Sequence, residues 1–294
     1  MSVTIIINPI SGGVSRGQGR ARAELASAAV DLNGDPAEVF VTERRGHARE
    51  LAEAALRRGT RLVISWGGDG TLNEVASALA FQSVPIGLVP AGSGNGFARE
   101  LRVNLRPEQA IADAIRAVPR TIDLGQVNDR LFVNVAGFGL DAYVAAQFDQ
   151  PGNRRRGFAG YAAITARALT SYVPETYTIT TTAGCKVSRA VLVTVANSAQ
   201  FGSGARIAPR ALLDDGLLDL VVVEERARWR TVLNVRRLFD GTVERIPGCS
   251  ICSIEQATIE SARPMVFHVD GEPVEAGKQV QVRVLPAALR VAVR

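Results

Sequence analysis

The sequence predicts two domains: a doubly wound α/β domain with a mostly parallel sheet, followed by a mostly antiparallel, sandwich-like β domain. Up to residue 120, short apolar runs alternate with amphipathic helical patterns, which is typical of parallel sheets. After residue 120 most runs have β character, and turn signals such as Asp270-Gly271 separate several of them. We therefore expect residues 1–120 to form the first domain and residues 121–294 the second, with the last strand free to pack back on the first.

Each element is predicted from the spacing of its apolar residues. In the first domain, strands are expected over Val3 to Asn8, Ala37 to Thr42, Arg61 to Ser65 and Val84 to Val89. Helices are expected near residues 21–32, 48–56, 72–80 and 107–118. In the second domain strand patterns predominate, and helices are expected near residues 138–149, 157–171 and 227–240.

Length and composition fit a globular protein with a buried core. The chain has 294 residues, of which 47% are hydrophobic and 21% charged. Basic residues exceed acidic residues by 34 − 29 = 5, which suits a polyanionic ligand or an anionic membrane surface without requiring either. No apolar run approaches the roughly 18 residues that span a bilayer. The N-terminal run is interpreted as a strand and not a signal peptide, so we expect a cytoplasmic protein.

The stretch from Trp66 to Val75 combines the end of a strand, a glycine turn and the start of a helix. Three glycines in four positions expose backbone N–H groups where the helix dipole is positive, which suits a phosphate group. Thr71 and Glu74 have the spacing of a capping box. A carboxylate in this position would repel phosphate unless a cation lay between them. Asp69 is therefore interpreted as a group beside a metal ion or as a proton acceptor.

Two more glycine-rich loops follow predicted strands. Asn8-Pro9-Ile10-Ser11-Gly12-Gly13 follows the first strand, and Pro90-Ala91-Gly92-Ser93-Gly94-Asn95 follows the fourth. Ligands of parallel sheets bind beyond the carboxyl ends of the strands, so three such loops at one edge predict a phosphate site. For the Gly-Gly-Asp-Gly loop taken alone, the structural alternative is a turn that merely needs glycine for its positive φ angles.

The Gly-Gly-Asp-Gly-Thr motif resembles the nucleotide-binding signature of the diacylglycerol kinase catalytic domain. That superfamily includes bacterial lipid kinases, ceramide and sphingosine kinases and, more distantly, NAD kinases. Motifs from Asn8 to Glu272 follow the order of the family. The resemblance implies an ATP:lipid phosphotransferase that uses ATP and Mg²⁺, with the nucleotide in a cleft between the domains. The expected acceptor is the hydroxyl of a lipid such as diacylglycerol or a sphingoid base.

The resemblance also implies which residues form the active site. Glu272, in Asp270-Gly271-Glu272, is the expected general base toward the lipid hydroxyl, and Asp69 is expected beside Mg²⁺; the reversed assignment stays open. The expected nucleotide-binding residues lie in the loops, at a strand end and in the following helix: Asn8, Gly12, Thr42, Gly67, Gly68, Asp69, Gly70, Thr71, Asn73, Gly92, Ser93 and Asn95.

Two further sites follow from the resemblance. Asp141 lies in a Gly-x-Gly-x-Asp-Ala element and is expected to hydrogen-bond the headgroup of the acceptor, although a helix cap would explain it equally. The segment Ala208 to Asp219 matches one that holds a structural Mg²⁺ in some bacterial members. The implied ligands are the carboxylate of Asp215 and the backbone carbonyls of Leu212 and Leu217. Oxygen ligands suit such a hard cation.

The chain departs from the family pattern in the third loop. Ser93 replaces a threonine and keeps its hydroxyl, whereas Gly96 replaces an aspartate, so the metal arrangement of the family cannot be copied whole. The Pro-Ala-Gly-Ser-Gly-Asn form looks more like that of sphingosine kinases, which puts diacylglycerol as the acceptor in doubt. An NAD kinase-like enzyme is one alternative, but Asn73-Glu74 lies inside the first helical turn and not in a separate adenine-binding segment. A catalytically silent regulator that binds nucleotide or lipid is the other.

The expected partners follow from this assignment. They are ATP, a lipid alcohol and the inner face of a membrane, contacted peripherally through Arg154-Arg155-Arg156 and the aromatic residues after it. Nucleic acid is not expected, and a homodimer stays open.

Overall fold

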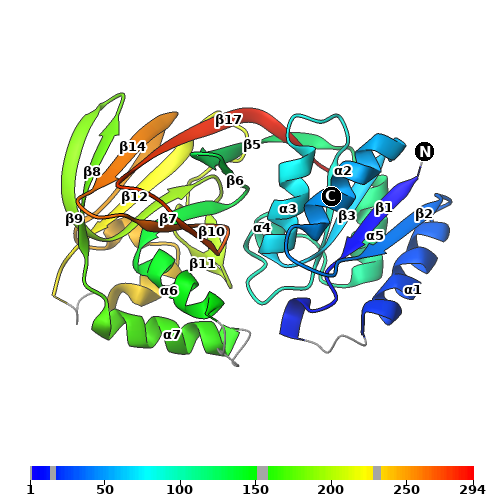
Figure 1. Cartoon of the computed structure of the whole chain (residues 1–294), viewed down its shortest axis with the longest axis horizontal. Helices are drawn as coiled ribbons and strands as arrows, with labels where there is room; N and C mark the ends of the chain where they lie inside the picture. The colour runs from blue at the N-terminus through cyan, green and yellow to red at the C-terminus, as the bar shows by residue number, and fades with distance from the viewer. Residues whose placement is uncertain (1, 14–17, 151–157, 228–232) are drawn as a thin grey trace. The chain divides into compact units, whose positions relative to one another are not determined.

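The computed structural model describes residues 2–13, 18–150, 158–227 and 233–294. The chain forms two compact units, Met1–Ile122 with Ala287–Arg294, and Asp123–Pro286 (Figure 1). Each unit is described by itself below. The arginine cluster predicted to contact a membrane, Arg154 to Arg156, lies outside the described residues.

The first unit is built on a parallel sheet. Its strands lie in the order β2 (Ala37–Val41), β1 (Val3–Ile7), β3 (Leu62–Gly67) and β4 (Ile86–Pro90), and the end of β17 (Gln279–Val291) pairs with β4. Strands β1 and β3 are buried over their whole length. Their apolar runs are unbroken because helices cover both faces of such a sheet.

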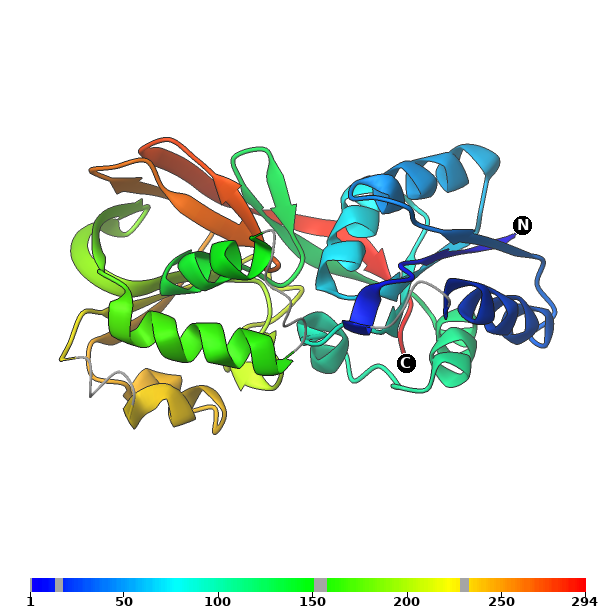
Figure 2. The same ribbon diagram turned by 60° about the horizontal axis from the view of Figure 1, so that its bottom comes forward.

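Helices lie on both faces of this sheet (Figure 2). α1 (Gln18–Asp31) and α5 (Pro107–Arg116) share one core with the strands. α2 (His47–Arg58) and α3 (Asp69–Leu79) pack against each other and cover the opposite face. A 3-10 turn (Ser11–Gly13) follows β1, and the short α4 (Gly96–Glu100) follows β4. The doubly wound α/β prediction is confirmed.

The second unit is mostly antiparallel. One path of hydrogen-bonded strands runs β16 (Glu272–Glu275), β15 (Val266–Val269), β7 (Val135–Gly139), β9 (Gly184–Ala196), β8 (Glu175–Thr181), β14 (Gln256–Ser261) and β17. β12 (Leu218–Glu224) pairs with β9 and with β13 (Cys249–Ile254), and β5 (Arg120–Val127) pairs with β6 (Arg130–Phe132). Smaller elements are β10 (Gln200–Gly202), β11 (Ala205–Arg206) and the 3-10 turns Val235–Leu238 and Val243–Arg245.

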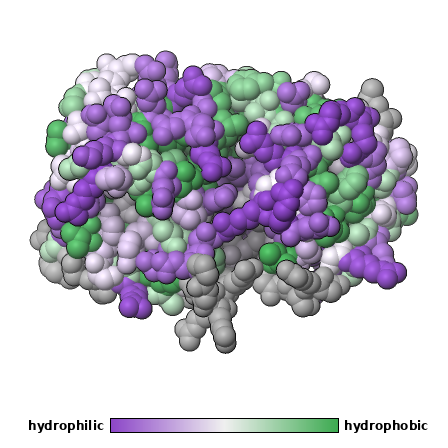
Figure 3. Space-filling view, viewed as in Figure 1, coloured by the Kyte–Doolittle hydropathy of each residue, from purple (hydrophilic) through white to green (hydrophobic). Residues whose placement is uncertain are grey.

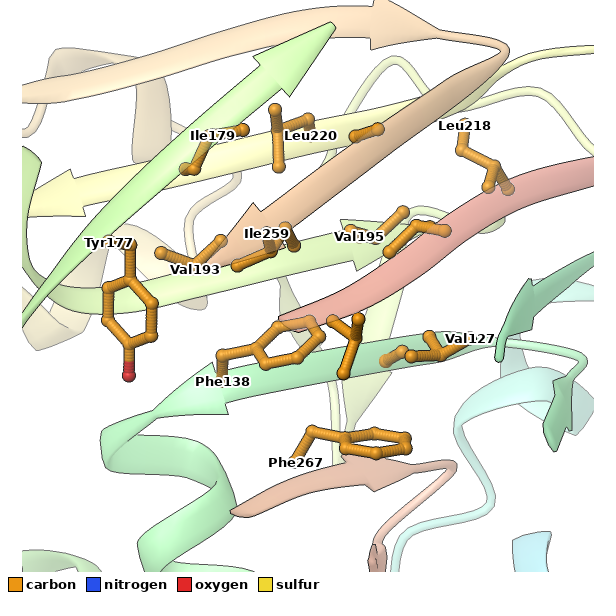
Figure 4. Close-up of a cluster of buried hydrophobic side chains, with 14 of the residues drawn as sticks. Val127, Phe138, Tyr177, Ile179, Val193, Val195, Leu218, Leu220, Ile259 and Phe267 are labelled. Carbon is orange, nitrogen blue, oxygen red and sulfur yellow. The ribbon is translucent and has the colours of Figure 1, made fainter. Parts of the chain in front are cut away.

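The core of the second unit fills the space between its strands (Figure 4). The rings of Phe138 and Phe267 stack with their centroids 5.6 Å apart. Aliphatic residues of neighbouring strands, including Ile179, Val193 and Leu220, complete this core. Two helices, α6 (Leu140–Asp149) and α7 (Phe158–Ser171), pack against each other, and α6 follows β7 directly. The predicted antiparallel, sandwich-like architecture is confirmed.

The capping box predicted at Thr71 and Glu74 is wrong. Helix α3 begins at Asp69, so Thr71 lies inside its first turn. The N-cap residue of α3 is Gly68, and no side chain forms a cap hydrogen bond there. The Glu74 carboxylate instead accepts the backbone N–H groups of Gly46 and Ala48, at 2.9 and 3.0 Å. Glu74 thus caps the start of the neighbouring helix α2, which has no side-chain cap of its own.

Two further expectations concern less regular parts of the molecule. Of the helix expected over 227–240, the described residues include the 3-10 turn Val235–Leu238, and residues 228–232 lie outside them. Among the described residues, no helix is long and apolar enough to cross a membrane. On the face drawn in Figure 3, hydrophilic residues surround scattered apolar ones, as on an ordinary protein surface.

Candidate active site

The three glycine-rich loops of the first unit follow three adjacent parallel strands. Ile7 pairs with Trp66, and Trp66 pairs with Val89, so the strands end side by side. The ladder continues into the loops, because Asn8 N–H donates to the Trp66 carbonyl at 2.9 Å and Ala91 N–H donates to the Gly67 carbonyl at 2.8 Å. The predicted meeting of the loops at the carboxyl edge of the sheet is therefore observed.

Asn8 links the first loop to the start of α3. Its Nδ2 donates to the hydroxyl of buried Thr71 at 3.0 Å, and its Oδ1 accepts the N–H of Ile10 at 3.1 Å. The first α-helical bond of α3 runs from Leu72 N–H to the Gly68 carbonyl. The earlier N–H groups of the helix therefore have no helical acceptor, which is the arrangement that binds anions at helix N-termini.

The second and third loops approach each other closely through glycines. A Cβ atom on Gly92 would lie 2.6 Å from the Gly68 Cα, and one on Gly94 would lie 3.1 Å from Oδ2 of Asp69. Asn95 closes the third loop, because its Oδ1 accepts Gly92 N–H and its Nδ2 donates to the Gly92 carbonyl, both at 2.8 Å. Larger residues at Gly68 or Gly92 would push these two loops apart.

The other predicted nucleotide-binding residues take different places. Gly12 has the left-handed φ of 82° in the turn after β1. Thr42 follows β2 and donates its N–H to the Ile7 carbonyl at 2.8 Å, so it lies at the same edge of the sheet. Asn73 lies in the second turn of α3, and Ser93 is exposed in the third loop.

Arg22 is a residue of this site that the sequence analysis missed. Its guanidinium donates to the Asn8 carbonyl at 2.9 Å and to the hydroxyl and carbonyl oxygens of Ser11 at 3.1 and 3.2 Å. It also lies over the ring of Trp66, 5.9 Å from the centroid. Burial lowers the pKa of Arg22, but a guanidinium keeps its charge in proteins. Arg22 thus holds the first loop in shape and adds a positive charge beside it.

In the second unit, the Asp270-Gly271 turn joins β15 to β16. The Asp270 carboxylate accepts the backbone N–H groups of Val133, Asn134 and Val135 at 2.8, 2.9 and 3.0 Å. Asp270 therefore anchors the turn to the loop after β6 and to the first residue of β7. Glu272, the expected base, follows the turn as the first residue of β16 and pairs with Val269.

Asp141 lies in the first turn of α6 and is buried, with 5% of its surface exposed. Its Oδ2 accepts the hydroxyl of Thr194 and lies 3.3 Å from Nε2 of His268, while its Oδ1 accepts Ala142 N–H at 2.8 Å. The contact predicted between Asp141 and a lipid headgroup stays a prediction. The sequence analysis did not single out His268, since a histidine within an apolar strand carries no local signal.

The acidic turn expected to hold a structural Mg²⁺ is closed by hydrogen bonds. Oδ1 of Asp215 accepts Leu217 N–H at 3.0 Å, and Oδ2 of buried Asp123 accepts Gly216 N–H at 2.7 Å. In the described part of the chain, no three or more His, Cys, Asp or Glu side chains cluster as metal ligands. The predicted set of Asp215 with the Leu212 and Leu217 carbonyls contains a single carboxylate, and it stays a prediction.

Comparisons with known proteins agree with both units. Residues 2–127 match the model of the diacylglycerol kinase catalytic domain, and residues 134–293 match that of the YegS C-terminal NAD kinase beta sandwich-like domain. The crystal structure of a diacylglycerol kinase from Bacillus anthracis aligns with a TM-score of 0.72 at 19% identity, covering 100% of this chain and 97% of that one. This similarity shows the fold.

Fold and domain matches thus define the class: a diacylglycerol kinase-type catalytic domain joined to a NAD kinase-like β-sandwich. Two relatives, each named probable lipid kinase YegS-like, come from Pectobacterium atrosepticum and Pseudomonas aeruginosa. They are 30% and 32% identical, over 96% and 93% of this chain and 95% and 90% of their own lengths. The chain belongs to the YegS-like lipid kinase family, and the family predicted from the motifs is confirmed.

Proposed function

We propose that the protein transfers the γ-phosphoryl group of ATP to the hydroxyl of a lipid such as diacylglycerol or a sphingoid base. The observation that carries this proposal is the meeting of three glycine-rich loops around the N-terminus of α3. The names of the relatives support a lipid as the acceptor.

The loops supply what a triphosphate requires. Backbone N–H groups near Gly12, Gly68 to Thr71 and Gly92 to Asn95 would bind phosphate oxygens, and Arg22 would keep the first loop in its binding shape. Bound Mg²⁺ would offset the charge that gathers on the transferred phosphoryl group. Asp69, a carboxylate among these loops, is the residue suited to hold it.

The second unit would act on the lipid. Glu272 would accept the proton of the lipid hydroxyl, and the bonds of Asp270 would keep the turn before it in place. The reversed assignment, with Asp69 as the base and Glu272 as a positioning group, stays open. The acyl chains would remain in or near the bilayer while the enzyme contacts the membrane peripherally.

An NAD kinase-like activity is less well supported. That activity would need an Asn-Glu pair at the adenine, but the Glu74 carboxylate bonds to the start of α2. The relatives are named as lipid kinases, which also favours a lipid acceptor.

The test is phosphate transfer from labelled ATP to an extracted lipid mixture, with the product identified by mass, and with NAD offered in a parallel reaction. We expect a phosphorylated lipid and no NADP. The Asp69→Asn protein serves as the control for contaminating kinases. Labelled NADP, or no transfer to any lipid, would contradict the proposal.

A further inference from the structure

The pair of Asp141 and His268 lies in the second unit, next to the turn that carries Glu272. Asp141 lies in the first turn of α6 and His268 lies in β15; they are 5% and 4% exposed. Oδ2 of Asp141 lies 3.3 Å from Nε2 of His268. On the other side of the ring, Gly271 N–H donates to Nδ1 of His268 at 3.2 Å.

These two contacts determine the tautomer of the imidazole. A backbone N–H can only donate, so Nδ1 of His268 must be an unprotonated acceptor toward Gly271. The remaining ring proton is then on Nε2, from which it is donated to the Asp141 carboxylate. Asp141 therefore selects the tautomer that lets His268 hold Gly271, because the other tautomer would place two donors face to face.

Neighbouring residues leave room for the Asp141–His268 pair and pack against it. Gly137 pairs with His268 across β7 and β15, and a Cβ atom there would lie 1.8 Å from Oδ2 of Asp141 and 2.6 Å from Nε2 of His268. The glycine thus leaves the space that the pair occupies. The His268 ring also packs edge-on against Phe201, with centroids 6.2 Å apart. The imidazole is held by polar contacts at both nitrogens and by packing.

We infer that Asp141 and His268 are positioning residues that fix the backbone of Gly271 and thereby the placement of Glu272. Asp270 anchors one side of the turn through three backbone N–H groups, and His268 anchors the next residue. Glu272 follows Gly271 directly, so a change in the Gly271 peptide moves the glutamate. The consequence for catalysis rests on the proposed function, whereas the tautomer and the anchoring do not.

The tautomer can be measured without any activity. The chain contains two histidines, His47 and His268, so two sets of imidazole signals are expected in ¹H–¹⁵N spectra. The His47→Gln variant assigns them. We expect a neutral His268 with its proton on Nε2 in the wild type, and a slowly exchanging Gly271 amide that exchanges faster in Asp141→Asn. A proton on Nδ1, or Gly271 exchange that is equal in the two proteins, would overturn the inference.

Two substitutions of His268 separate its two contacts. His268→Asn places an acceptor near the position of Nδ1, whereas His268→Gln places its amide near that of Nε2. We expect His268→Gln and Asp141→Asn to lower kcat about tenfold or more with little change in KM for ATP. We expect the kcat of His268→Asn to stay above that of His268→Gln. An unchanged kcat in His268→Gln would overturn the inference. A wild type inactive on every lipid would refute the proposed function, and the spectra would still decide the tautomer.

Discussion

Asp69 and Asp270 each precede a glycine, yet their surroundings differ. The Asp270 carboxylate accepts three backbone N–H groups and is part of the framework of the second unit. Asp69 lies at the first position of α3, where a Cβ on Gly94 would approach its Oδ2 to 3.1 Å. Similar sequence contexts therefore place one carboxylate in a structural role and the other among the glycine-rich loops.

We expect Asp69→Asn to reduce turnover by well over tenfold while the free energy of unfolding changes little. The amide keeps the shape of the turn but loses the charge that would hold Mg²⁺. Asp31→Asn, at the exposed end of α1, is the matched control and should leave turnover unchanged. If the Asp69 variant kept more than about a tenth of its activity, the carboxylate would supply less than about 1.4 kcal/mol to the barrier.

Buried tyrosines predict how stability depends on alkaline pH. Burial raises the pKa of Tyr172 to about 12. Burial also raises the pKa of Tyr177, and the nearby Tyr172 and Asp141 add to this rise. The folded pKa values exceed the unfolded value near 10, so their stabilising contribution is present below about pH 10 and is lost as the pH rises above it. The free energy of unfolding should fall from about pH 10 to about pH 12, the range between the unfolded pKa and the folded pKa of Tyr172. The double variant with phenylalanine at both positions should lose less, and an equal loss would contradict this account.

At the scale of elements, helix α2 depends on a residue from its neighbour. Glu74 of α3 accepts the N–H groups of Gly46, the N-cap of α2, and of Ala48 in its first turn. We expect Glu74→Ala to lower the free energy of unfolding by about 1–3 kcal/mol in urea denaturation, because two partly buried donors lose their acceptor. Glu74→Gln keeps one acceptor oxygen and should cost less.

The control for this prediction is Glu53→Ala, also on α2. Its exposed ion pair with Arg49 should contribute about 0.5 kcal/mol or less. Equal effects of Glu53→Ala and Glu74→Ala would show that Glu74 does not cap the helix.

Close packing of the second and third loops gives another prediction. Gly92→Ala would bring a methyl group within 2.6 Å of the Gly68 Cα, so the loops must separate. We expect ATP affinity, measured by calorimetry, to fall about tenfold or more. Gly277→Ala is the control, because a Cβ atom there meets nothing within 4 Å and its φ is not left-handed. Wild-type affinity in the Gly92 variant would mean that the loop spacing does not matter for binding.

At the scale of the whole molecule, the two candidate catalytic carboxylates belong to different units, Asp69 to the first and Glu272 to the second. If both act on one phosphoryl transfer, Glu272→Gln should lower kcat strongly while ATP affinity stays nearly constant, because a base acts on the acceptor. The double variant with Asp69→Asn should cost far less than the product of the single losses, since residues that act as a unit are not additive.

Kinetics of the two single variants and the double variant provide the measurement. A Glu272→Gln enzyme with full turnover would remove the general base from the proposal. It would leave the family membership intact, because that rests on the sequence and the fold.

Much of the fold could be predicted because it depends on local patterns. The β-branched run of β1, the helical spacing in α2 and the strand–glycine–helix order around Asp69 all lie within a few consecutive residues. The predicted start of α3 was wrong because Thr71 and Glu74 only match the spacing of a capping box. The Glu74 carboxylate instead accepts two backbone N–H groups at the start of the neighbouring helix α2.

The sequence by itself determined the fold class, the family and the three glycine-rich loops, since each depends on residues that lie close together along the chain. Only the tertiary structure decided that Arg22 holds the first loop, that Glu74 caps α2, and that His268 meets Asp141. These contacts join residues 14, 28 and 127 positions apart. Local propensity and spacing act over about one helical turn or strand pair, so the partners in such contacts are selected only when the whole chain packs.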